Sequence, residues 1–155
     1  MTDLTDLLNP DAVLADMPVA GKKKLFAQLG QAAHRAWGLD ARQVADSIAE
    51  RERLGTTGFG SGIAIPHGRI DGIEQVRGLF VRLAQPVDFD AIDDAPVDLV
   101  FMLLSPADAG AEHLKALARV SRAMRDRAFA DKLRGAANGD ALYALLAGVE
   151  ARDAA

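Results

Sequence analysis

The stretch VDLVFMLLSP, residues 97–106, is apolar at successive positions and therefore on both faces of an extended chain. This pattern is typical of a strand in the interior of a sheet that is covered on both sides. Residues 76–89, VRGLFVRLAQPVDF, alternate as a second strand would, and GIAI at residues 62–65 predicts a third. A sheet therefore occupies the middle of the chain.

Helical periodicity lies on either side of these strands in the sequence. Apolar residues recur at helical spacing over residues 22–37, after a strand or loop in residues 1–20. A second helix is expected over residues 40–55, where Asp40 and Gln43 form a capping-box-like pair. Three further helices are expected at residues 111–126, 129–136 and 139–148. The order indicates an α/β layer architecture in one domain over residues 1–155, with a core of about 5–148.

Composition excludes several classes of function. The chain has 155 residues and no cysteine, which rules out thiolate metal sites, thiol catalysis and disulfides. Neither a signal peptide nor an apolar run of about 18 residues is present, so we expect a cytoplasmic protein without membrane insertion. The formal net charge is -4, and the one basic run is GKKKL at residues 21–25. We interpret these lysines as a solvated helix face and expect no nucleic-acid partner.

The amino-acid composition changes at residues 55–68, GTTGFGSGIAIPHG, which contain five glycines. Repeated glycine permits positive backbone torsions and lets backbone N–H groups approach a ligand closely. His67 follows Pro66 at the end of the predicted GIAI strand, and Gly68 gives the backbone conformational freedom after the turn. This placement predicts an imidazole at the rim of a sheet, where α/β folds keep their sites. An ordinary exposed turn is the alternative.

Two more side chains are candidates for the same site. His113 is expected in the first turn of its helix on the inward face, either as a buried histidine bonded to a carbonyl or as a neutral histidine beside an anion. Arg51 shares a helix face with Val44 and Ile48, so it needs an anion or a carboxylate, or it caps the last helical carbonyls. His34 is expected in solvent.

The sequence lacks the motifs of metal sites, serine hydrolases and nucleotide-binding enzymes. No HExxH or HxxxH spacing is present, and the aspartates of residues 89–98 lack the glycine and glutamate of an EF-hand, so we expect a solvated turn there and no metal or cofactor. Ser61 does not lie in a GxSxG elbow. Without a P-loop or kinase signature, a phosphoryl donor would be another phosphoprotein. A neutral histidine with an inward arginine suits acceptance of a phosphoryl group.

Residues 51–70, RERLGTTGFGSGIAIPHGRI, closely resemble the active-site segment of the fructose and mannitol class of enzyme IIA in the bacterial phosphotransferase system. Within that class the segment is most similar to the nitrogen-related regulatory enzyme IIA. Residues 86–106 and HLKALARVSR at 113–122 also match, so the resemblance covers roughly residues 20–147. It implies a mixed sheet of about five strands flanked by helices on both sides.

The resemblance also implies roles for individual residues. His67 would accept the phosphoryl group from a histidine-containing phosphocarrier, itself supplied from phosphoenolpyruvate through an enzyme I. His113 would be the second active-site histidine, and Arg51 would lie near the phosphoryl group. We expect the backbone of Gly68 and of three loop residues to contribute N–H groups to it. These loop residues are Gly60, Ser61 and Gly62.

Three functions remain open. The first is a regulator of nitrogen, potassium or carbon metabolism whose phosphohistidine acts as a switch on kinases or transporters. The second is a sugar-specific enzyme IIA that passes the phosphoryl group to a IIB component for fructose- or mannitol-type uptake. The third is a metal-binding module that uses His67 and His113.

Overall fold

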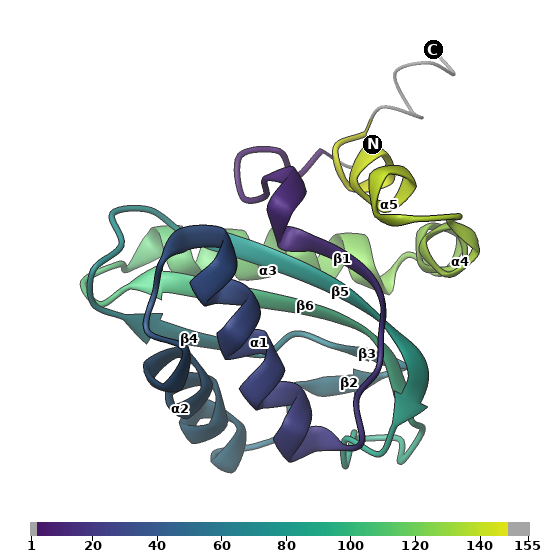
Figure 1. Ribbon diagram of the computed structural model, residues 1–155, viewed down its shortest axis with the longest axis horizontal. Helices are drawn as coiled ribbons and strands as arrows, with labels where there is room; N and C mark the ends of the chain where they lie inside the picture. Colours follow the sequence, from purple (N-terminus) through teal and green to yellow (C-terminus); the bar gives the residue numbers. More distant parts are fainter. Residues whose placement is uncertain (1–2, 149–155) are drawn as a thin grey trace.

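A mixed six-stranded sheet forms the centre of the structure, a computed structural model that describes residues 3–148 (Figure 1). The strand order is β1-β5-β6-β3-β2, and β4 also pairs with β6. Strand β6 runs antiparallel to β5 and parallel to β3 and β4. The bounds are β1 Val13–Met17, β2 Gly58–Gly60, β3 Ile63–Ala64, β4 His67–Ile70, β5 Arg77–Val87 and β6 Val97–Pro106.

The helices begin and end close to the predicted residues, because local capping signals set their ends. The carboxylate of Asp40 accepts a hydrogen bond from the amide of Gln43 at 2.9 Å, and Gly38 adopts a φ of 73° after the first helix. A short 3-10 helix, η1, spans Pro10–Ala12. The bounds are α1 Lys22–Trp37, α2 Ala41–Arg53, α3 Ala111–Arg125, α4 Arg127–Gly135 and α5 Gly139–Leu146.

Helices cover both faces of the sheet, as the apolar β6 sequence predicts. Helices α1 and α2 lie on the near face in Figure 1, and α3 lies behind the sheet. In β6, Val100 and Met102 pack in the core on the α1 and α2 side, whereas Leu99 and Phe101 pack in the core that includes α3, α4 and α5. The predicted α/β architecture, with a mixed sheet flanked on both sides, is confirmed. Residues 1–2 and 149–155 lie outside the described part, so the predicted domain limits stay a prediction.

One strand prediction needs correction. The GIAI strand is shorter than expected, because β3 covers only Ile63–Ala64. Pro66 has no N–H to continue the ladder, although its carbonyl still accepts a hydrogen bond from the amide of Leu103. Pairing with β6 resumes at His67, which is opposite Leu103. His67 therefore begins β4 beside the central strand instead of following the end of β3, and it is buried, so it does not lie in the exposed turn that was the alternative.

Candidate functional site

Two histidines meet at the carboxyl end of the central strand. His67 is the first residue of β4, and His113 lies in the first turn of α3, which follows β6. Their ring centroids are 5.6 Å apart, with an angle of 49° between the ring planes. Both residues are largely buried, at 8% and 7% exposed. The structure thus brings together two residues that are separated by 46 positions in the sequence, which is 113 minus 67.

Hydrogen bonds fix the tautomer of His67. Its Nδ1 lies 2.9 Å from the carbonyl oxygen of Ile65, and its Nε2 lies 3.2 Å from Nε of Arg51. A carbonyl only accepts and a guanidinium only donates, so Nδ1 carries the proton and Nε2 presents its lone pair. Burial lowers the pKa of His67; the bond to Ile65 opposes this, and the charge of Arg51 lowers the pKa further. Burial and Arg51 therefore favour the neutral form of the ring, with its lone pair on Nε2.

Arg51 reaches His67 from the last turn of α2. Its Nη1 also donates to the carbonyl oxygen of Gly55 at 3.0 Å, just beyond the helix end. The side chain thus bonds a carbonyl just beyond the helix end, not one of the last helical carbonyls, and it contacts an imidazole; an anion as its further partner stays a prediction. His34, by contrast, is exposed as expected, and its Nδ1 lies 2.9 Å from the carbonyl oxygen of Leu39.

Gly68 sets the distance between α2 and β4. A Cβ atom at this position would collide with Oγ of Ser47 and would lie 3.2 Å from the Cβ of Ser47. The side chain of Ser47 also donates to the carbonyl oxygen of Arg69 at 3.0 Å. Gly68 therefore serves close packing, which brings the end of α2 and Arg51 up to His67. Its φ is not in the left-handed region, so the predicted freedom at the exit of the turn is not what this glycine provides.

His113 is held by a buried hydroxyl. Its Nδ1 lies 2.6 Å from Oγ of Ser105, which is fully buried near the end of β6. The partner is thus a side chain and not the backbone carbonyl that one interpretation predicted. A hydroxyl donates or accepts, so this bond is compatible with either tautomer. Burial lowers the pKa of His113, and repulsion from Arg69, and from His67 whenever its ring is protonated, lowers the pKa further.

Glu52 supports the site and was not recognised in the sequence. Its Oε1 accepts hydrogen bonds from the amide and hydroxyl of Thr57 at 2.9 and 2.6 Å, and its Oε2 lies 2.8 Å from Nζ of Lys22. Burial acts to raise the pKa of this carboxyl, but the bonds from Lys22 and Thr57 outweigh it and hold the pKa below its ordinary value. Only 7% of the side chain is exposed. No local spacing reveals this contact, because Lys22 lies 30 residues away.

The structure does not bring the predicted loop residues to the histidines. Gly60, Ser61 and Gly62 form the turn between β2 and β3, and the amide of Ser61 donates to Asp93 at 3.0 Å. The carbonyl of Gly62 bonds the amide of Leu99, whereas His67 is opposite Leu103, four residues or about 13 Å further along β6. Of the glycine-rich segment, Gly68 adjoins His67 in the chain, and Gly55 is connected to His67 through Arg51, which bonds the Gly55 carbonyl.

The aspartates that might have suggested calcium serve the connection between β5 and β6. The carboxylate of Asp93 accepts the amides of Ser61 and Ala95, both at 3.0 Å, and the neighbouring Asp90 and Asp94 are exposed. The predicted solvated turn is confirmed for these three aspartates, whereas Asp98 lies in β6 and forms an ion pair with Arg134 at 2.9 Å. Within residues 3–148 no group of three or more histidine or acidic side chains is arranged to hold a metal ion.

Comparison with known proteins assigns the family. Residues 6–149 match the family model described as "Phosphoenolpyruvate-dependent sugar phosphotransferase system, EIIA 2". The chain belongs to this enzyme IIA family. It is 46% identical to the nitrogen regulatory protein of Bradyrhizobium diazoefficiens, over 93% of this chain and 94% of the relative. It is 41% identical to the nitrogen regulatory protein of Pseudomonas aeruginosa, over 97% and 98%.

The solved structures agree. The crystal structure of nitrogen regulatory protein IIA-Ntr from Neisseria meningitidis superposes with a TM-score of 0.84 at 37% identity, covering 91% of this chain and 97% of that chain. The family resemblance inferred from the sequence is therefore confirmed. As an enzyme IIA, the protein is a phosphotransfer component, and proteins of this family interact with phosphocarriers and IIB components. No helix within residues 3–148 is both long and apolar enough to cross a bilayer.

Proposed function

We propose that His67 accepts a phosphoryl group from the phosphohistidine of a phosphocarrier protein. The observation that carries this proposal is the bond between Nδ1 and the Ile65 carbonyl, which leaves the lone pair on Nε2. Nε2 forms the new N–P bond while the N–P bond of the donor breaks. The donor imidazole leaves with the electron pair, and the positive charge of the phosphoimidazolium moves to His67 together with the phosphoryl group. No proton has to be transferred.

Arg51 and His113 would stabilise the transferred group. The Nε atom of Arg51 donates to Nε2 of His67 at 3.2 Å, so it would turn from this lone pair to the oxygens of the phosphoryl group as the N–P bond forms. Fixed cationic donors of this kind lower the energy of the charge that develops during phosphoryl transfer. The ring of His113, 5.6 Å from that of His67, would be a second donor, and its hydrogen bond with Ser105 holds it in place.

We further propose that the phosphorylated and unphosphorylated forms regulate proteins of nitrogen, potassium or carbon metabolism. Support comes from the relatives, which are named as nitrogen regulatory proteins and are matched over nearly their whole length. The alternative is onward transfer to a IIB component in sugar uptake, as the description of the family model suggests. The two functions differ in the fate of the phosphoryl group, which is measurable.

The test is intact mass spectrometry after incubation with phosphoenolpyruvate, enzyme I and the phosphocarrier. Wild type and His67→Ala are compared, with His34→Ala as the matched control at an exposed histidine. We expect one acid-labile phosphoryl group on wild type and on His34→Ala, and none on His67→Ala. Phosphorylation of His67→Ala, or none of wild type with active donors, would refute the proposal. Rapid transfer from the phosphorylated protein to a fructose or mannitol IIB would favour sugar uptake over regulation.

A further inference from the structure

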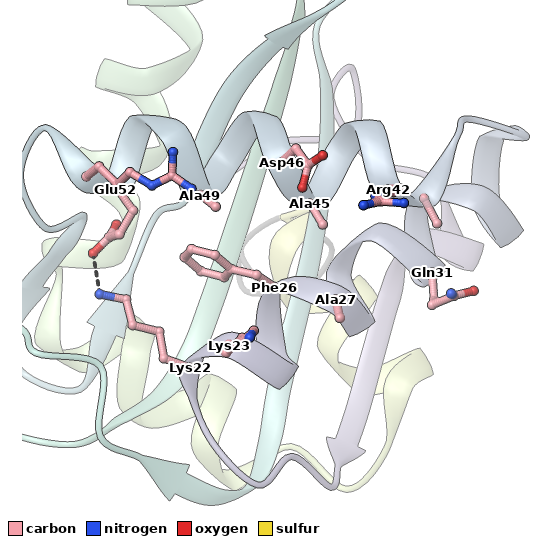
Figure 2. A pocket seen from close by; sticks show the side chains of 12 residues that line it. Lys22, Lys23, Phe26, Ala27, Gln31, Arg42, Ala45, Asp46, Ala49 and Glu52 are labelled. Carbon is pink, nitrogen blue, oxygen red and sulfur yellow. Dashed lines mark hydrogen bonds and ion pairs between the residues drawn. The ribbon is translucent and has the colours of Figure 1, made fainter.

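A groove of about 840 Å³ lies between α1 and α2, on the side of these helices away from the sheet (Figure 2). Figure 2 shows Phe26 and three alanines along its centre. The alanines are Ala27 on α1 and Ala45 and Ala49, one helical turn apart, on α2. Their short side chains leave the space between the helices unfilled, so the groove is an apolar channel at the surface.

The dimensions of the groove suit a helix. Along α1 it extends from Lys22 to Gln31, and along α2 from Ala41 to Arg53. These spans correspond to about 14 and 18 Å at 1.5 Å per residue, or about three turns of a helix. The groove walls are helices whose backbone groups are bonded internally, so an extended segment would find no backbone partners there. A helical segment satisfies its own backbone and lays its apolar face into such a groove.

The charged side chains that line the groove favour one sign of charge in the segment that binds there. Four cationic side chains line the groove, against the two carboxylates Asp46 and Glu52, and Glu52 is already neutralised by Lys22. Of the other cations, none has a hydrogen bond or ion pair with another side chain in the part of the chain that the structure describes. They are Lys23, Arg42 and Arg53, all of which are exposed. Complementary charge is therefore negative.

One end of the groove lies close to the proposed phosphorylation site. Lys22 lines the groove and binds Glu52, and Glu52 in turn accepts two hydrogen bonds from Thr57. Glu52 is also the neighbour of Arg51, which contacts His67. An acidic occupant that draws Lys22 toward itself would remove the partner that neutralises Glu52, and this would disturb the segment beside His67.

We propose that this groove docks an acidic amphipathic helix of a regulated protein, and that docking and phosphorylation of His67 influence each other through Lys22 and Glu52. The docking stands on the groove alone, whereas the coupling rests on the proposed function. Any coupling is reciprocal, so phosphorylation changes the affinity for the helix by the same factor as the helix changes phosphorylation. The basic run at residues 21–25 is then part of a binding surface and not merely a solvated face.

The docking is tested with a fluorescently labelled helical peptide of about 12 residues, with alanine and leucine on one face and glutamate beside it. Fluorescence anisotropy measures its affinity for the full chain. We expect Lys23→Glu with Arg42→Glu to weaken binding by at least about tenfold. The matched control is Lys24→Glu with Arg35→Glu, which changes the net charge equally at exposed positions outside the groove and should change affinity by less than about twofold.

Three results would overturn the docking. They are no binding of the acidic peptide, equal weakening in both double variants, and a dimer in sedimentation that Lys23→Glu with Arg42→Glu dissociates, since a second copy would then fill the groove. The coupling is tested by repeating the titration on phosphorylated protein, where equal affinity in both states would remove it. Because the first titration uses unmodified protein, failure of phosphorylation leaves the docking result readable, and failure of docking leaves the proposed function intact.

Discussion

The imidazole of His67 lies between a hydrogen-bond acceptor and a hydrogen-bond donor, which together determine the protonation of its two nitrogens. The Ile65 carbonyl holds the proton on Nδ1, and burial keeps the ring uncharged by lowering its pKa. Arg51 adds to this lowering and also occupies the side of the ring where a phosphoryl group would attach. In the proposed function, a single arginine would act on the His67 ring before transfer and on the phosphoryl oxygens after it.

Replacing Arg51 tests both effects. Arg51→Ala should slow phosphorylation of His67 by about 10²- to 10³-fold, the range for loss of one preorganised donor at a developing charge. The same change should raise the pKa of His67, because a nearby positive charge and part of the burial are removed. Single-turnover kinetics and an NMR titration of the ring measure the two quantities.

The control for this prediction is Arg35→Ala, an exposed arginine in the last turn of α1 that does not line the groove. It should leave the phosphorylation rate and the pKa of His67 unchanged. A variant at Arg51 with the rate and pKa of wild type would show that the contact with His67 carries no function.

At the scale of helices and strands, the sequence predicts the features that depend on neighbouring residues and misses those that depend on contacts between distant segments. The bounds of α1 agree with the prediction, because periodicity and Gly38 are signals within the helix itself. The break at Pro66 was missed, because only pairing with β6 shows that β4 starts at His67. The loop of residues 60–62 was misplaced for the same reason, since the glycines indicate close approach but not to which group.

Gly68 illustrates how element packing controls the site. Gly68→Ala should push α2 away from β4, because the added Cβ would meet the side chain of Ser47 and, at 3.3 Å, its backbone. Overpacking of this kind costs about 1–3 kcal/mol of unfolding free energy. Displacement of α2 would also carry Arg51 away from His67, so phosphorylation should slow. Urea unfolding and single-turnover kinetics measure the two effects.

Gly135→Ala is the matched control for Gly68→Ala, because no atom lies within 4 Å of the added Cβ. It lies at the end of α4 and should leave the phosphorylation rate unchanged. If Gly68→Ala kept both the stability and the rate of wild type, close approach of α2 would not be what positions Arg51.

Across the whole molecule, the site lies where both helical layers meet the end of β6. Helix α2 of one layer supplies Arg51, and α3 of the other supplies His113. Glu52 links the start of α1, the end of α2 and the segment that leads into β2 through its bonds to Lys22 and Thr57. Its buried carboxylate therefore ties parts of the chain that no local signal connects, and changing it should affect stability as well as the site.

Glu52→Gln keeps the shape of the side chain and removes its charge. At pH 7 we expect a loss of about 1–3 kcal/mol of unfolding free energy, since hydrogen bonds to a charged group are replaced by weaker ones. The pKa of Glu52 is lowered in the folded state, so its contribution is present above the unfolded pKa of the carboxyl and is lost as the pH falls through the folded pKa. The difference between wild type and variant should therefore shrink below about pH 4. Urea unfolding followed through Trp37, the only tryptophan, measures this difference at each pH.

The control is Glu50→Gln, at an exposed position of the same helix, which should change the unfolding free energy at pH 7 by less than about 0.5 kcal/mol. A difference for Glu52→Gln that stays constant between pH 7 and pH 3 would mean that the variant acts through packing and not through the charge of the carboxylate.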